Sequence, residues 1–474
     1  MIKIILLTVL ALTFTSAQAE DLRSKTLSLA APFGDHGILQ QKIPVPVWGT
    51  ADPKAQVTIT FASQTKTTIA DELGKWRVVL DPLKADVLTD LHKALEGREL
   101  VVSSELGSTK ESIKIKNILI GEVWVCAGQS NMAAKVRHNF RNQDPDDNLL
   151  KSNLPNIRQN HNSGKWILAT PGKAVGEFSR VGFCFAREVQ STIKVPVGLV
   201  NACVGGSNIE SWMRVAEVKS GSEPKGKKIN YGKLYQERLA PSVGYGIKGI
   251  LWYQGEANAS EGHSYFLKMK ALIADWRKSW NQGVLPFYFV QLAGIGKSPD
   301  NPEMGDGRAR VREAQRKVLT IKNTGMAVAV DIGGDKEHPA NKVEVGIRLA
   351  QWALNKCYER KNVVSGPLYK SFKVEGSSVR INFDFSRGLM FAEKTNYKQP
   401  KPTPNKKLLW ISIQSQDGRW HWADAKVDDK TLIVSSKKVV KPKAVRYAYT
   451  NRPLGCYLYN DAGLPASPFE FVIK

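Results

Sequence analysis

Cysteine is scarce in this chain of 474 residues, and proline and glycine are close to their average frequency in proteins. Its 5 cysteines lie far apart, which excludes a disulfide-dense scaffold and a C-x-x-C zinc site. Their odd number leaves at least one thiol unpaired, and we expect most of them to be buried small hydrophobic residues. The 38 glycines and 23 prolines exclude a collagen-like repeat, and a hydrophobic content of 42% excludes a disordered chain. The composition therefore predicts a globular protein of about two to four domains.

Long apolar runs are also missing, apart from residues 4–14 near the N-terminus. This run follows Lys3, is shorter than the ~20 residues that a membrane-spanning helix needs, and precedes Ala17 and Ala19. The order is typical of a signal peptide over residues 1–19, with an ordinary N-terminal strand as the alternative. We therefore expect a secreted or periplasmic protein, without stable membrane insertion after cleavage.

Acidic residues are outnumbered, with 44 Asp and Glu against 68 Lys and Arg, which gives a formal net charge of +24. Such a balance favours polyanionic partners. Because the chain carries no recognisable nucleic-acid motif, an anionic glycan is a better candidate than nucleic acid. The alternative is that the charge serves solubility alone.

The period of the hydrophobic residues divides the chain into three domains after the signal peptide. Residues 20–117 alternate in short β-rich runs, which predicts a β-sandwich. Residues 118–360 place apolar strands between helical segments such as 264–280 and 341–357, which predicts an α/β domain with a mostly parallel sheet. Residues 361–474 return to a β-rich pattern. The strands expected in the α/β domain are residues 123–127, 197–202, 247–253, 287–292 and 327–331.

A candidate nucleophile follows the first of these strands, where Gly128 and Gln129 lead into Ser130. Ligand sites of α/β sheets lie beyond the carboxyl ends of the strands, and a serine just past a buried strand is held rigidly. An isolated Gly-x-Ser is usually a plain turn, so the position of Ser130 is what makes it a candidate.

A candidate base, His338, follows the last expected strand, with Asp335 three residues before it. This spacing lets the carboxylate hold the imidazole Nδ1–H, so that Nε2 can accept the serine proton. The alternative is a surface loop with a helix-capping aspartate.

Two other strand ends offer donors for an oxyanion. Gly205 and Gly206 follow one strand and permit a close backbone approach, while Gln254 and Asn258 follow another and carry side-chain amides. Either segment taken alone would be an ordinary turn between a strand and a helix.

Four segments, in this order, resemble the sialate O-acetylesterase family of SGNH-type (GDSL-like) serine esterases: residues 121–132, 200–213, 252–258 and 335–342. Residues 45–49 and 463–469 also resemble that family, so nearly the whole mature chain is covered. The resemblance implies an SGNH-hydrolase (flavodoxin-like) α/β fold with helices on both faces of the sheet. The isoleucine that usually precedes the histidine is replaced here by Glu337.

The resemblance also implies roles for individual residues. Ser130 matches the nucleophile, His338 the base and Asp335 its acid. The amides of Ser130 and Gly206 match oxyanion donors, together with the side chain of Gln254 or Asn258. Glu256 is the alternative, either orienting the site or replacing Asp335 as the histidine's partner. No metal and no cofactor are implied.

The function expected from these residues is hydrolysis of O-acetyl groups on sialic acids or related sugars through an acetyl-serine intermediate. Acetylxylan or another acetylated polysaccharide is the alternative substrate. A different class of function, a glycan-binding protein with a vestigial esterase core, is the second alternative.

Overall fold

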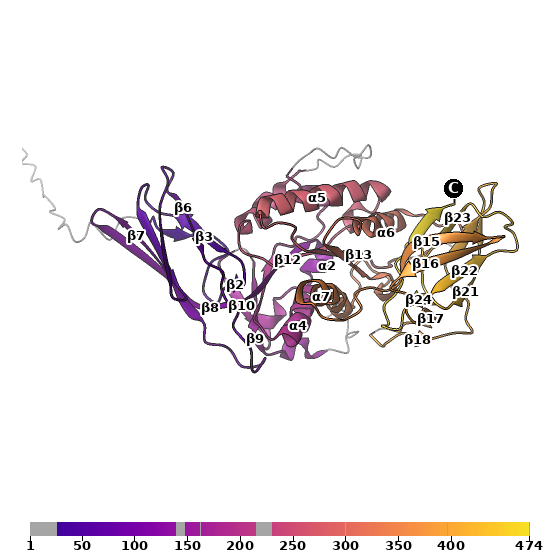
Figure 1. The fold of residues 1–474 in the computed structure, drawn as a ribbon, viewed down its shortest axis with the longest axis horizontal. Coiled ribbons are helices and arrows are strands. Elements are labelled where there is room, and N and C mark those ends of the chain that lie inside the picture. Colours follow the sequence, from indigo (N-terminus) through magenta and orange to yellow (C-terminus); the bar gives the residue numbers. More distant parts are fainter. Residues whose placement is uncertain are drawn as a thin grey trace, which may run out of the picture.

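The computed structural model describes residues 26–138, 147–161, 163–214, 230–298, 300–395 and 397–473. The expected signal peptide lies outside these residues. No helix in the described ranges is both long and apolar enough to cross a membrane. The molecule is elongated, with an N-terminal β region and a C-terminal β region at opposite ends of a central α/β region (Figure 1).

The N-terminal region consists of two sheets and one additional strand. Strands β1, β3 and β6 form one sheet, and β5, β4, β7 and the first half of β8 form the other. Burial alternates along β6, as expected for strands that cover a core with one face. The strands are β1 (Ser28–Leu29), β2 (Ile38–Gln40), β3 (Val45–Thr50), β4 (Gln56–Phe61), β5 (Gln64–Ile69), β6 (Lys75–Leu80), β7 (Arg98–Leu106) and β8 (Thr109–Gly128).

Strand β8 is 20 residues long and belongs to two regions at once. Its first half pairs with β7, and its second half pairs with β11 and β12 in the central sheet. One hydrophobic core extends from Leu27 to Val364. The boundary expected after residue 117 thus falls inside a continuous strand, and the first two expected domains share a core.

The central sheet has the order β10-β9-β11-β8-β12-β13-β14 and is parallel except for β10. Without β9 and β10, the order of the remaining five strands is 2-1-3-4-5, as in flavodoxin-like sheets. Strands β12 and β13 are fully buried and mostly apolar, as in sheets covered on both faces. The strands of this sheet besides β8 are β9 (Leu154–Asn160), β10 (Trp166–Ala169), β11 (Val197–Asn201), β12 (Gly249–Tyr253), β13 (Phe287–Gln291) and β14 (Thr324–Val328).

Helices cover both faces of this sheet. Helices α4 and α7 pack together on one face, and α5 and α6 on the other (Figure 1). The α-helices are α2 (Ser130–Ala133), α3 (Lys173–Gly176), α4 (Arg180–Ile193), α5 (Tyr265–Trp280), α6 (Gly307–Val318) and α7 (Lys342–Tyr358). Shorter turns of 3₁₀ or π type are η2 (Asp147–Lys151), η3 (Ile209–Trp212), η4 (Tyr235–Leu239), η5 (Ala240–Ser242), η6 (Glu256–Asn258), η7 (Gly262–Ser264) and η8 (Val330–Ile332).

The sequence-based elements match α5 and α7 to within one residue at each end. The strand expected at residues 327–331 is placed three residues too late in the sequence, because β14 ends at Val328 and the chain then turns into η8. All five cysteines are free in the structure, and Cys126, Cys184 and Cys456 are buried.

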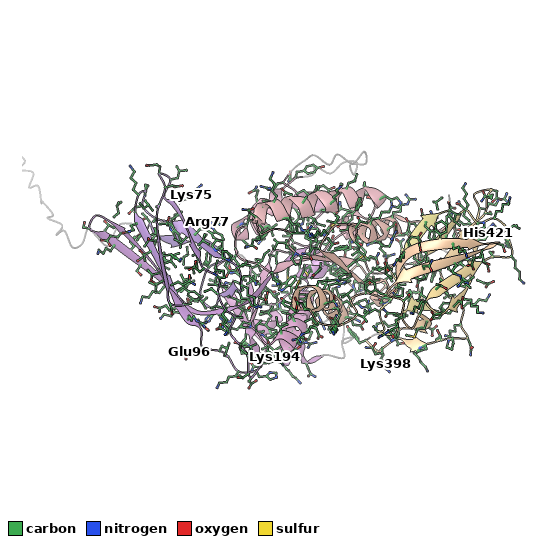
Figure 2. The ribbon with its side chains drawn as sticks, viewed as in Figure 1. Lys75, Arg77, Glu96, Lys194, Lys398 and His421 are labelled. Atoms are coloured by element: carbon green, nitrogen blue, oxygen red, sulfur yellow. The ribbon has the colours of Figure 1, made fainter. Side chains whose placement is uncertain are left out.

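The C-terminal region has its own hydrophobic core and three small sheets. It lies at the opposite end of the molecule from β6, as the positions of Lys75 and Arg77 on β6 and of His421 on β20 show (Figure 2). Its strands are β15 (Leu368–Glu375), β16 (Ser378–Asp384), β17 (Met390–Glu393), β18 (Lys401–Pro402), β19 (Ile411–Gln414), β20 (Trp420–Trp422), β21 (Asp424–Asp428), β22 (Thr431–Ser435), β23 (Ala444–Tyr447), β24 (Tyr457–Tyr459) and β25 (Phe469–Val472).

Candidate active site

Ser130 lies at the carboxyl end of β8, the strand between β11 and β12 at which the order of the sheet reverses. Gly128 makes this turn possible. It has a φ of +128°, and a Cβ there would come within 2.2 Å of the Tyr253 carbonyl oxygen. Ser130 is half-buried as the first residue of α2. The serine therefore stands where ligands of doubly wound sheets bind.

The glycine turn after β11 lies directly beside Ser130. The Val204 amide donates to the Gly128 carbonyl oxygen at 3.0 Å, and a Cβ on Gly205 would lie 3.7 Å from the Ser130 Cβ. Gly206 is exposed, with a left-handed φ of +68°. Within the described ranges, the amides of Ser130 and Gly206 have no hydrogen-bond acceptor. Both N–H groups expected to serve as oxyanion donors therefore remain available.

The Gln254 side chain, in contrast, is fully occupied inside the protein. Its Nε2 donates to Asn258 Oδ1 (2.7 Å), the Ser207 carbonyl oxygen (3.0 Å) and Gln129 Oε1 (3.2 Å), and its Oε1 accepts from the Tyr265 hydroxyl at 2.7 Å. The expected donation from Gln254 to a substrate does not fit this arrangement. Because Gln254 bonds both Gln129 and Ser207, it fixes the two loops beside Ser130 instead.

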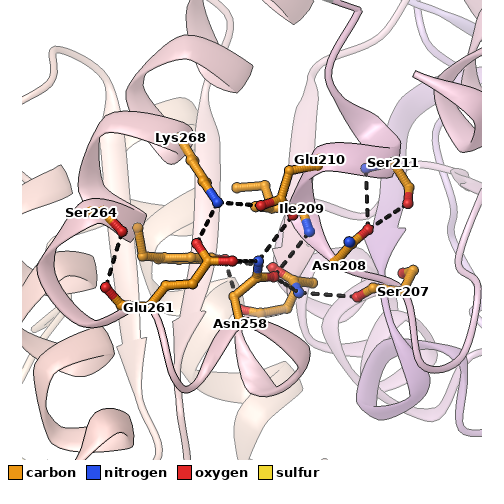
Figure 3. A network of polar contacts seen from close by, with 11 residues as sticks. Ser207, Asn208, Ile209, Glu210, Ser211, Asn258, Glu261, Ser264 and Lys268 are labelled. Atoms are coloured by element: carbon orange, nitrogen blue, oxygen red, sulfur yellow. Dashed lines mark hydrogen bonds and ion pairs between the residues drawn. The ribbon is translucent and has the colours of Figure 1, made fainter. Parts of the chain in front are cut away.

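Asn258 is also committed internally, within a buried ionic network (Figure 3). Its Nδ2 donates to Glu261 Oε1 (2.7 Å) and Glu210 Oε2 (3.0 Å), while its Oδ1 accepts from the Ile209 amide at 3.0 Å. Lys268 pairs with both carboxylates, and the three charged side chains are at most 3% exposed. Asn258 thus anchors the segment after the glycine turn, and its expected role as an oxyanion donor is not supported by these contacts.

Packed tryptophans hold the same segment from the other side. Trp212, Trp252 and Trp276 meet edge to face, with ring centroids 5.5–6.4 Å apart. Trp212 Nε1 donates to Ser207 Oγ at 3.0 Å, and Trp276 Nε1 to the Trp212 carbonyl oxygen at 3.0 Å. The turn beside Ser130 is therefore rigid because aromatic packing and ion pairs hold the residues that follow it.

His338 lies in the exposed loop between η8 and α7. Its ring has no hydrogen-bond partner among the described residues. The backbone just before it, at Glu337, accepts a hydrogen bond from Asn131 Nδ2 at 3.1 Å. Asn131 directly follows Ser130, so the structure brings the backbone beside the candidate base against the neighbour of the candidate nucleophile.

Asp335 does not contact His338 in this structure. Its carboxylate is 86% exposed and forms an ion pair with Arg452 of the C-terminal region. Glu337 forms a second such pair with Arg308, at 2.7 Å. The expected bond between Asp335 and His338 therefore differs from the contacts observed, because a nearby guanidinium takes the carboxylate.

Glu256, the alternative acid, lies closer to the nucleophile turn. Its Oε1 accepts from Asn131 Nδ2 at 2.5 Å, and its Oε2 is buried without a partner in the described part of the chain. Burial raises the pKa of Glu256. The site thus holds a carboxylate with one unused oxygen, attached through Asn131 to the backbone beside His338.

Two residues at this site, Asn131 and Lys342, were missed by sequence reasoning. Lys342 begins α7 and donates to Asn131 Oδ1 at 2.6 Å. Burial lowers the pKa of Lys342 to about 7. Asn131 lies within the motif around Ser130 and could have been found from it, whereas Lys342 carried no signal beyond its place in the histidine segment. In the described ranges, no three His, Cys, Asp or Glu side chains cluster to hold a metal.

Comparisons with known proteins indicate the family to which the chain is related. The family model described as carbohydrate esterase, sialic acid-specific acetylesterase matches residues 120–355. The sialate O-acetylesterases of Homo sapiens and Mus musculus are 27% and 26% identical to this chain, over 89% and 93% of its length and 88% and 93% of theirs. A solved carbohydrate acetylesterase from Xanthomonas citri superposes with a TM-score of 0.81 at 31% identity, covering 94% of this chain and 99% of that one. The residues matched by the family model include every candidate site residue.

Proposed function

We propose that this chain, which belongs to the carbohydrate esterase family of sialic acid-specific acetylesterases, hydrolyses O-acetyl esters of sugars with Ser130 as its nucleophile. The observation that carries this proposal is the position of Ser130 at the switch point of the sheet, with Gly205 packed beside it and the His338 loop bonded to its neighbour. An SGNH-type fold is part of the same proposal, supported by the 2-1-3-4-5 strand order.

The reaction takes place in two steps. Ser130 Oγ attacks the acetyl carbonyl while His338 takes its proton, and the sugar oxygen leaves with that proton as acetyl-Ser130 forms. Water then attacks the acetyl group, His338 accepts the water's proton, and acetate leaves while the serine is restored. Neither step needs a metal or a cofactor.

The oxyanion of each tetrahedral intermediate is stabilised by the amides of Ser130 and Gly206. Both N–H groups are free of acceptors in the described chain, and both belong to turns fixed by their neighbours. Donors that are held in place before the reaction need no reorganisation when the charge develops. Gln254 and Asn258 contribute by fixing these turns.

Glu256 is the acid that assists His338 in this proposal, with Asp335 in a surface ion pair. The support is the buried, unused Oε2 of Glu256 and the engagement of Asp335 by Arg452. We expect Glu256→Gln to lower kcat by about 10²–10⁴-fold, because the imidazolium loses its counter-charge. Asp335→Asn, the matched control, is expected to stay within about threefold of wild type.

Steady-state kinetics on p-nitrophenyl acetate at several pH values separates the two carboxylates. If Asp335→Asn shows the large loss and Glu256→Gln the small one, the assignment is reversed and Asp335 is the partner of His338.

The proposed substrate class is an O-acetylated sialic acid. Two guanidinium groups, Arg308 and Arg452, lie beside the His338 loop, and the acidic partners that they hold are mostly exposed. A substrate carboxylate can replace such exposed partners, since arginine binds carboxylates through paired N–H donors. The net charge of +24 favours the same class. Acetylated xylan is the alternative, for which these arginines would be unnecessary.

The test is acetate release by residues 20–474, wild type beside Ser130→Ala, from an O-acetylated sialic acid, acetylated xylan and p-nitrophenyl acetate. The proposal expects turnover that Ser130→Ala abolishes, with the highest kcat/KM on the sialic acid. A preference for xylan would retain the mechanism and change the substrate. Absence of turnover on all three would favour a glycan-binding protein.

Export through a signal peptide at residues 1–19 is a further part of the proposal, supported by the apolar run and the small residues that follow it. Determining the N-terminus of the mature protein tests it. A protein recovered from the producing cell with residue 1 intact would contradict export by cleavage.

A further inference from the structure

The loop that carries His338 is held on both sides of the histidine by two side chains. The carbonyl oxygen of Glu337, the preceding residue, accepts from Asn131 Nδ2 at 3.1 Å. The carbonyl oxygen of Pro339, the following residue, accepts from Lys342 Nζ at 2.7 Å. Both contacts are made to the main chain, so they fix the position of the loop whatever the histidine ring does.

These two side chains are also bonded to each other. Lys342 Nζ donates to Asn131 Oδ1 at 2.6 Å, and Asn131 Nδ2 donates to Glu256 Oε1 at 2.5 Å. Asn131 is 1% exposed and Lys342 is fully buried. Since a buried hydrogen bond competes little with water, the set acts as a single connected unit.

Peptide bonds connect these hydrogen-bonded residues to both Ser130 and His338. Asn131 is joined to Ser130 by a peptide bond, and its amide bonds Glu337, the residue joined to His338. Lys342 is the first residue of α7, which packs on the face of the sheet. A connection from nucleophile to base therefore runs through Asn131, and Lys342 supports it from the start of α7.

We propose that Asn131 and Lys342 are positioning residues that hold the His338 loop where the imidazole can reach the Ser130 hydroxyl. This inference deepens the proposed function and rests on it. The exposed His338 ring has no partner in the described ranges to fix it, so its placement depends on the loop. A general base must come within about 2.6–3.2 Å of the serine oxygen, and a misplacement of about 1 Å can cost about a hundredfold in rate.

The first experiment compares Lys342→Met, Lys342→Arg and Asn131→Ala with wild type. We expect Lys342→Met and Asn131→Ala to lower kcat on p-nitrophenyl acetate by about 10–100-fold. KM should change by less than about threefold, because Asn131 and Lys342 act on the position of His338 and not on binding of the substrate. Lys342→Arg retains N–H donors at this position and should recover part of kcat. Rates are expressed per serine titrated to completion with a phosphonate ester, so that unfolded protein does not count.

Lys394→Met is the matched control. Lys394 is a lysine of similar burial, 4% exposed, paired with Glu344 in the first turn of α7 at 2.8 Å, but it has no recorded contact with Asn131 or with the His338 loop. We expect it to lower the melting temperature without changing kcat per titrated site. A kcat loss in Lys342→Met no greater than that in Lys394→Met would overturn the proposal.

Ser130→Ala in the same series separates this proposal from the one on which it rests. If Ser130→Ala retains activity, the proposed function fails. If Ser130→Ala is inactive while both Lys342→Met and Asn131→Ala keep kcat within about twofold of wild type, the proposed function stands and the positioning role of Asn131 and Lys342 is wrong.

Discussion

Lys342 is a buried amine that donates to Asn131 Oδ1 and to the Pro339 carbonyl oxygen. Burial lowers the pKa of Lys342 to about 7, against the attraction of Glu256. The residue is therefore suited to an uncharged state at and above neutral pH.

This environment predicts a pH dependence of stability. The unfolded chain keeps Lys342 protonated up to its ordinary pKa of about 10.4, whereas the folded chain releases the proton near pH 7. Between these values the unfolded state binds more protons, so the free energy of unfolding contributed by Lys342 rises with pH. Relative to Lys342→Met, wild type should gain up to about 1.4 kcal/mol per pH unit across this window.

Urea unfolding of both proteins between about pH 7 and about pH 10 measures this difference. The test is the difference between the unfolding free energies of the two proteins at each pH, because all other titrating groups are shared. A difference that does not change with pH would mean that Lys342 stays charged in the folded protein.

At the residue scale, the sequence predicted the serine turn but not the roles of the polar side chains around it. Gly128 and Ser130 are recognisable because a strand-to-helix turn demands glycine and places the next residues at the sheet edge. An amide such as Gln254 can donate equally well to a substrate or to a neighbouring carbonyl. Only the fold shows that Ser207 and Gln129 already take its hydrogen bonds.

At the scale of elements, the buried network of Glu210, Glu261 and Lys268 joins η3, η7 and α5. Lys268→Met would leave two carboxylates close together without a counter-charge. Breaking such a buried set typically costs about 3–5 kcal/mol. We expect a loss of that size in the free energy of unfolding, measured by denaturant titration.

Lys407→Met is the control for this loss. Lys407 pairs with Asp424 on the surface, where the two side chains are 83% and 64% exposed. Exposed pairs contribute about 0–1 kcal/mol, so this variant should unfold almost as wild type does. Equal losses in the two variants would show that the buried network does not stabilise the fold.

Elements with a clear apolar period were predictable, and a buried strand made largely of polar residues was not. The apolar runs of β11, β12 and β13 and the spacing in α7 reflect packing on a core, which the sequence records directly. Strand β9 is fully buried yet carries Asn156, Arg158 and Asn160, so no apolar run marks it in the sequence. The shift of β14 arises because Val330 and Ile332 are apolar yet belong to the turn η8.

At the scale of the whole molecule, Arg312 connects the catalytic sheet to the C-terminal region. Its guanidinium donates to the carbonyl oxygens of Leu292 (2.8 Å) and Ala293 (2.8 Å) after β13, and of Thr450 (2.6 Å) and Asn451 (2.7 Å) in the C-terminal region. Arg312 is 0% exposed. Arg312 thus joins the two regions through four main-chain acceptors, and the hydrogen bond from Gln291 to Ser467 at 2.8 Å adds to this junction.

Arg312→Met should loosen this junction. Each buried carbonyl left without a donor costs about 1–3 kcal/mol, so we expect a loss of at least about 3 kcal/mol and earlier proteolytic cleavage within the C-terminal region. Limited proteolysis followed by mass spectrometry identifies the first cleavage sites. Arg387→Met, which changes an arginine whose side chain is 77% exposed, is the control. First cleavage in the N-terminal region would contradict the role given to Arg312.

The proposed mechanism depends on formation of an acetyl ester on Ser130 during the reaction. The most direct measurement is acid quenching of the enzyme within its first turnovers of p-nitrophenyl acetate, followed by mass spectrometry of the peptide that contains Ser130. We predict one added acetyl group on that peptide in wild type and none in Ser130→Ala. An enzyme that releases acetate while this peptide stays unmodified, or a Ser130→Ala variant that keeps the wild-type rate, would contradict it.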